Sequence, residues 1–252
     1  MIKIILSGCN GHMGCAVSAN ALEDGELEVV AGVDKDIDSV PQYFNVYKSF
    51  LEVKERGDVI IDFSNPSALE PMLKYAVSNE IPLVLCTTGY DENQTASIVR
   101  VSKLIPVFKS GNMSIGINLL SELVRKACAV LGSQYDIEII EKHHRRKVDA
   151  PSGTALLLAD ACASALPYEP QFVYDRSGER RPRNAVDIGI STVRAGTIVG
   201  QHEVIFAGQN EVIELKHSAA SRDVFAVGAI RAAKFISKVK IPGLYGMSDM
   251  LK

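Results

Sequence analysis

The first 34 residues carry the pattern that most constrains the fold. Residues 2–6 form an apolar strand, and glycines at positions 8, 11 and 14 precede a helix expected over 15–22. A second apolar strand, residues 27–33, ends at Asp34. A strand, a glycine turn, a helix and a strand ending in an acid are typical of a dinucleotide-binding βαβ unit. The glycines let the backbone approach a pyrophosphate at the helix N-terminus, and Asp34 can accept hydrogen bonds from an adenosine ribose.

The glycine spacing is GxxGxxG rather than the more usual GxGxxG. Asn10 takes the middle position, and asparagine tolerates left-handed backbone better than most residues. The alternative is a glycine turn that binds no ligand, but the acid at the expected distance favours a nucleotide site. Asp34 favours the free 2′-hydroxyl of NADH, whereas Lys35 can pair with the 2′-phosphate of NADPH. We therefore predict use of both cofactors, with NADH at least as good.

The alternation of apolar strands and helices continues to residue 114. We expect strands at 58–63, 83–86 and 106–109, and helices at 66–78 and 91–103. Polar loops follow these strands at residues 62–65, 87–89 and 110–114. Ligands in open α/β sheets bind at the carboxyl ends of strands, so these loops are candidate cofactor contacts. Ordinary turn chemistry is the alternative for each loop.

The pattern changes in the second half of the chain. A long amphipathic helix at 115–131 and a strand at 135–141 come first, and residues 167–186 are expected to form a long loop. From residue 187 the apolar period becomes two. Strands at 187–194, 197–206 and 211–217, joined by glycine-containing turns, predict an antiparallel meander.

The sequence therefore predicts an α/β protein with two domains. Residues 1–114 and 222–252, including a returning helix at 224–236, form a Rossmann-like domain with a parallel sheet. Residues 115–221 form a smaller α+β domain with a mostly antiparallel open sheet, expected to bind substrate and to mediate oligomerisation. We expect the active site in a cleft between the two domains.

A basic segment stands out within the second domain. Residues 143–147 are His-His-Arg-Arg-Lys, and a Pro-Ser-Gly turn at 151–153 precedes an apolar helix expected from Thr154 to Leu166. Free N–H groups at a helix start bind anions, so the segment and the helix together suit a small molecule with two carboxylates. The alternatives are a solvated face or a nucleic-acid patch. The net charge of −3 argues against nucleic acid as a partner.

Composition excludes several other classes of protein. The 252 residues are 47% hydrophobic and 23% charged, which is ordinary for a globular protein with a sizeable core. No apolar run approaches the roughly 20 residues of a membrane span, so we expect no membrane partner. The five cysteines are an odd number without a CxxC pair, which predicts reduced thiols in the cytoplasm and no metal site.

The remaining chemistry is hydride delivery from a nicotinamide combined with proton transfer. Reducing a C=N or C=C bond places a hydride on one atom and a proton on its neighbour. A lysine or histidine of the basic segment can donate that proton, with its pKa lowered by like-charged neighbours. In an extended strand His144 and Lys147 face opposite ways, so they share a pocket only if the strand breaks between them.

The basic segment also carries a family resemblance. Residues 141–155, Glu-Lys-His-His-Arg-Arg-Lys-Val-Asp-Ala-Pro-Ser-Gly-Thr-Ala, resemble the signature of the 4-hydroxy-tetrahydrodipicolinate reductase family, formerly called dihydrodipicolinate reductases. Residues 8–14, 87–89, 193–200 and 243–245 support it in the family's order. The resemblance implies a homotetramer that reduces 4-hydroxy-tetrahydrodipicolinate, a small cyclic dicarboxylate, to tetrahydrodipicolinate. The reduction uses NADH or NADPH, releases water and belongs to lysine and diaminopimelate biosynthesis.

The resemblance also implies roles for individual residues. His143 matches the family's acid/base residue and Lys147 its proton donor. His144, Gly153 and Thr154 match substrate contacts, and Ser152 of the same turn joins them as a candidate. The candidate cofactor contacts are Gly8, Cys9, Asn10, Gly11, His12, Met13, Asp34, Lys35, Cys86, Thr87, Thr88, Ser110, Gly111, Asn112 and Met113. His12, Cys86 and the 110–113 loop depart from the family's usual residues, which bears on cofactor preference.

Two other functions compete with this one. Another NAD(P)-dependent amino-acid or imino-acid dehydrogenase would share the two-domain build, but the Lys147–Thr154 stretch disfavours it. A nucleotide-sensing regulator would use the basic segment on nucleic acid, and the acidic pI near 6 disfavours that function.

Overall fold

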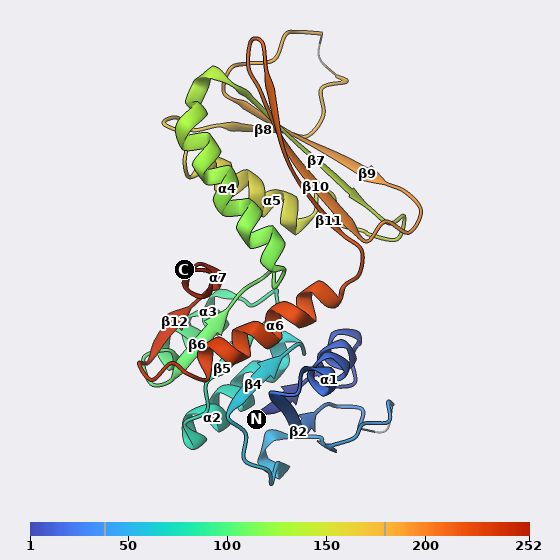
Figure 1. Ribbon diagram of the computed structural model, residues 1–252, viewed down its shortest axis with the longest axis vertical. Helices are drawn as coiled ribbons and strands as arrows, with labels where there is room; N and C mark the ends of the chain where they lie inside the picture. Colours follow the sequence, from blue (N-terminus) through green and yellow to red (C-terminus); the bar gives the residue numbers. More distant parts are fainter. Residues whose placement is uncertain (38, 179) are drawn as a thin grey trace. The chain divides into compact units, whose positions relative to one another are not determined.

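The computed structural model describes residues 1–37, 39–178 and 180–252, and the chain divides into two compact units. The first unit comprises Met1–Ile115 and Asp223–Lys252, and the second comprises Gly116–Arg222. The second unit is thus inserted into the chain of the first, and the ribbon of Figure 1 shows the first unit in blue to green and again in red.

A parallel sheet forms the centre of the first unit. Its strands are β1 (Ile2–Ser7), β2 (Leu27–Val33), β3 (Asn45–Tyr47), β4 (Val59–Asp62), β5 (Leu83–Leu85), β6 (Pro106–Lys109) and β12 (Gly243–Tyr245). The spatial order is β12-β6-β5-β4-β1-β2-β3, so the chain reverses direction across the sheet between β1 and β4. This is the doubly wound order of a Rossmann-like domain, as predicted. The edge strands β3 and β12 were not predicted.

Helices cover both faces of this sheet. They are α1 (His12–Asp24), α2 (Leu69–Asn79), α3 (Glu92–Val101), α6 (Asp223–Ile236) and α7 (Met247–Met250), with single 3₁₀ turns η1 (Phe50–Glu52) and η2 (Pro66–Ala68). The alternation of strand side chains explains the two layers, because Ile4 and Leu6 join the core under α1 and α6. Ile5, between them, points to the core under α2 and α3. The centre of β1 is therefore apolar on both faces of the sheet.

The second unit is built on a mixed sheet. Its elements are α4 (Ile115–Leu131), η3 (Gly132–Gln134), β7 (Asp136–His143), α5 (Gly153–Ala163), β8 (Gln171–Val173), β9 (Asp187–Arg194), β10 (Gly200–Ala207) and β11 (Val212–Ala219). The order is β11-β10-β7-β9-β8. β10 runs antiparallel to β11 and β7, whereas β9 runs parallel to β7 and β8.

Two details of the predicted second domain are wrong. β9 and β10 do not pair as neighbours in a meander, because β7 lies between them. The connection from β7 through α5 is a helical crossover, which makes β9 parallel to β7. In addition, the predicted loop at 167–186 contains the short edge strand β8. A local turn signal cannot tell whether two strands are adjacent or separated by a third strand.

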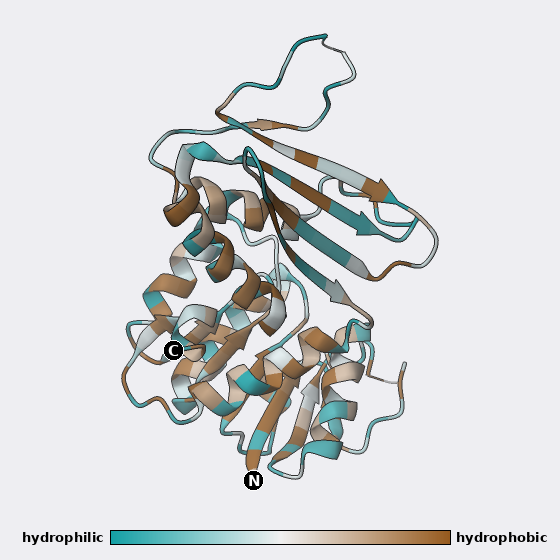
Figure 2. Ribbon diagram, turned by 45° about the horizontal axis from the view of Figure 1, so that its top comes forward, coloured by the Kyte–Doolittle hydropathy of each residue, from teal (hydrophilic) through white to brown (hydrophobic). Residues whose placement is uncertain are grey.

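Within the residues that the structure describes, helices cover only one face of this sheet. Ile139 of β7, Val204 and Phe206 of β10 pack with residues of α4 and α5, such as Val124 and Leu158. In the hydropathy view of Figure 2 both helices lie on the same side of the sheet. None of the helices within the described ranges is long and apolar enough to cross a bilayer.

Candidate active site

The glycine loop after β1 is shaped so that only glycine fits at two of its positions. Gly8 has a φ of 75°, and a Cβ there would lie 2.7 Å from the carbonyl oxygen of Phe63. A Cβ at Gly14 would lie 2.1 Å from the carbonyl oxygen of Gly8. The loop therefore folds tightly against the start of α1, which begins at His12. This backbone cradle at a helix N-terminus fits a pyrophosphate.

The acid at the end of β2 holds the glycine loop. Asp34 Oδ2 accepts the backbone N–H of Asn10 at 3.0 Å, and Oδ1 accepts that of Asp36 at 3.2 Å. The Asn10 side chain donates to the carbonyl oxygen of Asp36 at 2.6 Å and accepts from Gln42 at 3.1 Å. Asn10 does not use the left-handed backbone that asparagine tolerates. Its side chain instead ties the loop to the segment that follows β2.

A cavity of about 480 Å³ opens beside this loop. Its lining includes Gly8, Asn10, Asp34, Lys35, Lys48 and Ser67. The Lys35 ammonium group is exposed and donates to the hydroxyl of Ser67 at 3.4 Å. The carboxylate and two lysines on one cavity match the needs of a ribose hydroxyl and a phosphate.

The other candidate cofactor contacts divide into core residues and loop residues. The side chains of Cys9, Cys86 and Met113 are buried in the core under α1 and α6, so they offer a ligand only their backbone. Burial raises the pKa of Cys86 well above its ordinary value, with the nearby Asp62 acting in the same direction. Thr88 and Gly111 are exposed.

The loop after β6 is internally braced. The Ser110 hydroxyl donates to the carbonyl oxygen of Asn112 at 2.8 Å, and Asn112 Oδ1 accepts the N–H of Ser114 at 2.9 Å. These bonds fix the loop at the carboxyl end of β6, where a ligand of the parallel sheet is expected.

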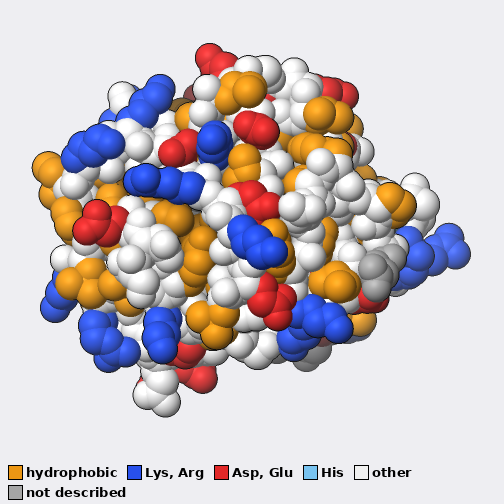
Figure 3. All heavy atoms as spheres, turned by 90° about the horizontal axis from the view of Figure 1, so that it is seen from below, with side chains coloured by type: hydrophobic (Ala, Val, Ile, Leu, Met, Phe, Trp, Pro, Cys, Tyr) orange, Lys and Arg blue, Asp and Glu red, His pale blue; other side chains and the backbone are white. Residues whose placement is uncertain are grey.

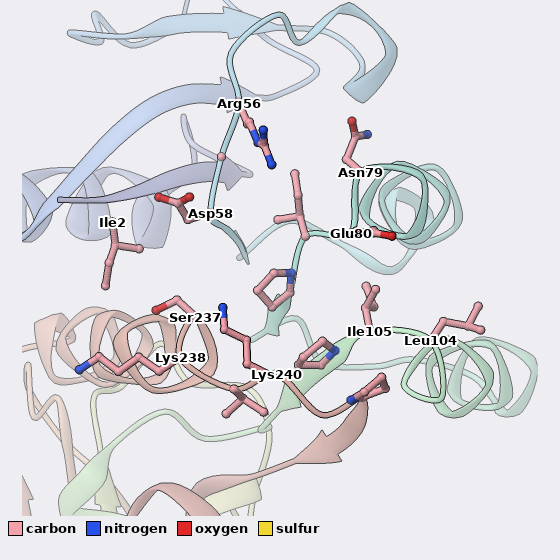
Figure 4. Close-up of a pocket in the computed structure, with 16 residues that line it drawn as sticks. Ile2, Arg56, Asp58, Asn79, Glu80, Leu104, Ile105, Ser237, Lys238 and Lys240 are labelled. Carbon is pink, nitrogen blue, oxygen red and sulfur yellow. The ribbon is translucent and has the colours of Figure 1, made fainter.

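A second cavity of about 620 Å³ lies at the opposite end of the same sheet. Figure 4 shows its lining, which includes Ile2, Arg56, Asp58, Leu104 and Lys240. It adjoins the amino ends of β4, β5 and β6, where a doubly wound sheet does not present its ligand loops. None of the candidate site residues lines it.

In the second unit the basic segment is a turn rather than a strand. β7 ends at His143, and the backbone N–H of Lys147 donates to the carbonyl oxygen of His144 at 3.1 Å. The break that would let His144 and Lys147 share a pocket is therefore present. Arg145 and Arg146 are exposed.

Two ordered contacts hold the ends of this turn. The ammonium group of Lys147 lies 2.7 Å from the carboxylate of Asp149 and holds the pKa of that carboxyl below its ordinary value. Arg222, at the end of the unit, lies 3.3 Å from Nε2 of His144. On the face that Figure 3 displays, acidic side chains are interspersed among the lysines and arginines.

The helix after the Pro-Ser-Gly turn begins one residue earlier than predicted. Ser152 is the N-cap of α5, and its hydroxyl accepts the N–H of Ala155 at 3.2 Å. The same hydroxyl lies 3.0 Å from Nε2 of His202 on β10. Ser152 is 2% exposed, so its side chain serves the cap, whereas Gly153 is exposed with open space above it.

His143 is the last residue of β7, and its side chain lies on the face of the sheet that the helices cover. Its neighbours there include groups to which the sequence analysis gave no role. Its Nδ1 is 2.5 Å from Oε2 of Glu141, which is fully buried and paired with Arg194 of β9 at 2.8 Å. Its ring meets that of His202 edge to face, with centroids 5.1 Å apart. Burial lowers the pKa of His143, and Glu141 opposes that shift. The predicted lowering holds for His143, but burial rather than crowding is its largest cause.

Register across the sheet explains why these residues meet. Glu141 pairs with Thr192 on β9 and with His202 on β10, and His202 pairs with His217 on β11. These side chains share the face that packs on α5, so they form one polar row beyond the apolar core. Sequence reasoning missed Glu141, Arg194 and His202 because it did not place β7 between β9 and β10.

The parallel sheet, its glycine loop and the acid after β2 define a dinucleotide-dependent oxidoreductase with an inserted second domain. Models of the N-terminal and C-terminal parts of dihydrodipicolinate reductase match residues 2–113 and 116–251. The chain belongs to the dihydrodipicolinate reductase family.

Named relatives cover the whole chain. A 4-hydroxy-tetrahydrodipicolinate reductase of Caldanaerobacter subterraneus subsp. tengcongensis is 52% identical over all of this chain and 99% of its own length. An enzyme of the same name from Clostridium novyi is 48% identical with the same coverage of both chains.

Solved structures agree on the fold. Dipicolinate-bound dihydrodipicolinate reductase from Paenisporosarcina sp. TG-14 superposes with a TM-score of 0.83 at 24% identity, covering 99% of both chains. A myo-inositol dehydrogenase of Corynebacterium glutamicum reaches 0.60 at 15% identity, covering 94% of this chain and 89% of its own. At these identities the likeness concerns architecture alone.

Proposed function

We propose that this chain reduces 4-hydroxy-tetrahydrodipicolinate to tetrahydrodipicolinate with NADH or NADPH and with release of water. Relatives carrying the name of that enzyme align over the full length of the chain at up to 52% identity. The observation that carries the proposal is the turn at 144–147 next to the N-terminus of α5, since it offers cationic groups and a helix dipole to a dicarboxylate.

The substrate-binding roles follow from exposure and charge. His144 and Lys147 are partly exposed in one turn, and Gly153 and Thr154 are the first residues of α5. We assign one carboxylate of the substrate to the start of α5 and the other to the basic turn. Ser152 supports the helix start from behind, through its cap and its contact with His202.

The proton-transfer roles follow from chemistry and position. His143 is assigned as the acid/base residue, because its ring is fixed by Glu141 and adjoins the basic turn. Lys147 is assigned as the donor of the proton that completes the reduction. The leaving hydroxyl departs as water after taking a proton from a group of the site. When bound, NADH or NADPH supplies the hydride.

The first unit has the residues to hold that cofactor. Gly8, Gly11 and the start of α1 form the pyrophosphate cradle, and Asp34 with Lys35 faces the adenosine ribose. Asp34 favours NADH, and Lys35 gives NADPH a phosphate partner, so we propose that both cofactors are used.

We further propose a cytoplasmic homotetramer that assembles through the uncovered face of the mixed sheet. That face carries Ile140, Lys142, Glu203 and Ile205, which are half-buried within the single chain. The five cysteines are free thiols, which suits a reducing compartment. Ile205→Arg should lower the mass measured by light scattering, and an unchanged tetramer would place the interface elsewhere.

The direct test is cofactor oxidation with substrate generated in place from pyruvate and aspartate semialdehyde by the condensing synthase. Loss of absorbance at the nicotinamide band that depends on the synthase supports the proposal. Binding of NADH without such oxidation would contradict the dicarboxylate assignment and leave other imino-acid substrates to be assayed.

A further inference from the structure

One buried carboxylate connects the separate parts of the proposed substrate site. Glu141 accepts two hydrogen bonds from Arg194, at 2.8 Å each, and one from Nδ1 of His143 at 2.5 Å. It also accepts the backbone N–H of Ser152 at 3.0 Å and the hydroxyl of Thr192 at 3.2 Å. Its own side chain is fully buried.

The energetic balance explains why this carboxylate stays ionised. Removing a carboxylate from water costs several kcal/mol of desolvation free energy. One well-placed ion pair, with the remaining hydrogen bonds satisfied, offsets about the same amount. Burial works to raise the pKa of Glu141, but Arg194 and His143 hold it below its ordinary value. Since Arg194 supplies the positive charge, His143 need not be protonated for Glu141 to be satisfied.

The tautomer of His143 follows from the same bond. A neutral ring beside a carboxylate must place its one proton on Nδ1, which leaves the lone pair on Nε2. Gly200 keeps that side of the ring open, because a Cβ there would come within 3.2 Å of Nε2. Nε2 is thus the atom available for proton exchange.

Among the described groups that face His143, the carboxylate of Glu141 is the acceptor that orients its ring. Arg194 on β9 and Lys147 in the following turn are cations, and His202 on β10 meets the ring edge to face. Burial, with the His143 ring acting in the same direction, lowers the pKa of His202 to about 4, so His202 is neutral at pH 7. None of these groups replaces the carboxylate.

We propose that Glu141 is the positioning residue of the site. One oxygen fixes His143 as the Nδ1–H tautomer, and the other holds the Ser152 N–H and with it the start of α5. The acid/base ring and the helix N-terminus are thereby set by one side chain. The inference rests on the proposed function for the role of His143, but the tautomer can be tested without it.

The informative substitution is Glu141→Gln. An amide nitrogen at the Oε1 position would oppose the donors of Ser152 and Arg194, whereas at the Oε2 position it opposes one Arg194 nitrogen only. The amide nitrogen therefore takes the Oε2 position and donates to Nδ1 of His143. The ring then carries its proton on Nε2. In that tautomer Nε2 has no free lone pair and cannot accept a proton from the substrate side.

Glu138→Gln is the matched control. Glu138 lies on the same strand but on the opposite face, and its carboxylate is also paired with an arginine, Arg176, at 2.7 Å. The control loses the same charge and an arginine pair without touching His143, at a side chain that is 32% exposed where Glu141 is fully buried.

The primary measurement is the tautomer of His143 by nitrogen NMR of the full chain labelled at its histidine rings. We expect Nδ1–H in the wild type and in Glu138→Gln, and Nε2–H in Glu141→Gln. An Nε2–H ring in the wild type overturns the proposal, and this spectrum decides even if the variant fails to fold. The same result in wild type and Glu141→Gln also overturns it.

Kinetics give the second measurement. Glu141→Gln should lower kcat by about 10²–10⁴-fold with the KM for NADH unchanged, as for loss of a correctly placed proton-transfer group. In a His143→Ala background the same change should cost less than about threefold, because the two residues act as one unit. Full additivity would overturn the proposal. A wild type that shows the Nδ1–H tautomer but does not reduce the dicarboxylate would instead contradict the proposed function alone.

Discussion

The carboxylate of Asp34 accepts the backbone N–H of Asn10 at 3.0 Å, so the acid that ends β2 holds the glycine loop that ends β1. One side chain thus shapes the glycine loop, which we propose as the pyrophosphate cradle, and lines the cavity beside it. Shaping the pyrophosphate loop and binding the adenosine ribose are therefore coupled through Asp34. A substitution at Asp34 is the sharpest test of cofactor binding.

Replacing Asp34 by Ala should weaken the binding of NADH more than the binding of NADPH. The variant loses the ribose acceptor and the tie to Asn10, and each lost hydrogen bond to a charged group costs about 1.5–3 kcal/mol. We expect the KM for NADH to rise at least about tenfold, with a smaller rise for NADPH. Initial rates with each cofactor check this. Glu23→Gln, at an exposed side chain near the end of α1 that does not line the cavity, is the control. A wild-type preference for NADPH of about a hundredfold or more would contradict the roles given to Asp34 and Lys35.

Lys147→Ala should lower turnover by about 10²–10⁴-fold, as expected for losing a positioned proton donor. Binding of NADH should persist, because the cofactor residues belong to the other unit. Stopped-flow turnover and NADH titration by fluorescence measure the two quantities. Lys126→Ala, at an exposed lysine of α4 outside the basic turn, should remain near wild type. Near-normal turnover of Lys147→Ala would remove this residue from the mechanism.

Two glycine-to-alanine changes should differ in their effects on stability and on ligand binding. At Gly14 a Cβ meets the Gly8 carbonyl at 2.1 Å, so Gly14→Ala should cost about 1–3 kcal/mol of stability and abolish NADH binding. At Gly153 a Cβ meets open space, so Gly153→Ala should fold as the wild type does. Its KM for the dicarboxylate should nevertheless rise about tenfold, because the methyl group covers the helix start. Thermal melts and KM values together check both, and a normal KM for Gly153→Ala would move the substrate away from α5.

Stability should fall as the pH drops from about 6.5 to 4. Burial lowers the pKa of His202 to about 4, below its unfolded value of about 6.5. The unfolded chain binds more protons in this window, so stability is fully present above pH 6.5 and is lost as the pH falls toward 4. For His202 alone the loss is on the order of 3 kcal/mol, and the lowered pKa values of His143 and His217 add in the same direction.

Urea midpoints of wild type and variants across pH 4–8 measure this dependence. His202→Gln should flatten the curve, because it removes the group that must be protonated on unfolding. Phe206→Ala, in the core of the same unit, should lower stability by about 3–5 kcal/mol at every pH without changing the slope. An unchanged slope in His202→Gln would show that the pH dependence arises elsewhere.

The sequence alone determined the Rossmann-like unit and marked the two segments from which the candidate site is proposed. The apolar runs at β1, β2, β4, β5 and β6 are local signals, and the glycine loop and basic segment need only their own residues to be recognised. The sequence also set the condition that the strand break between His144 and Lys147, and the structure meets this condition with the turn after His143.

Only the tertiary structure decided which buried residues contact the basic segment and the start of α5. Whether β9 lies next to β7 or β10 depends on the crossover through α5 and on burial of the inner sheet face, which no local window contains. That choice of neighbour brings Arg194 to Glu141 and His202 to Ser152, residues 53 and 50 positions apart in the chain. Cross-strand register is a non-local property, so the network that positions His143 appears only once the sheet is assembled.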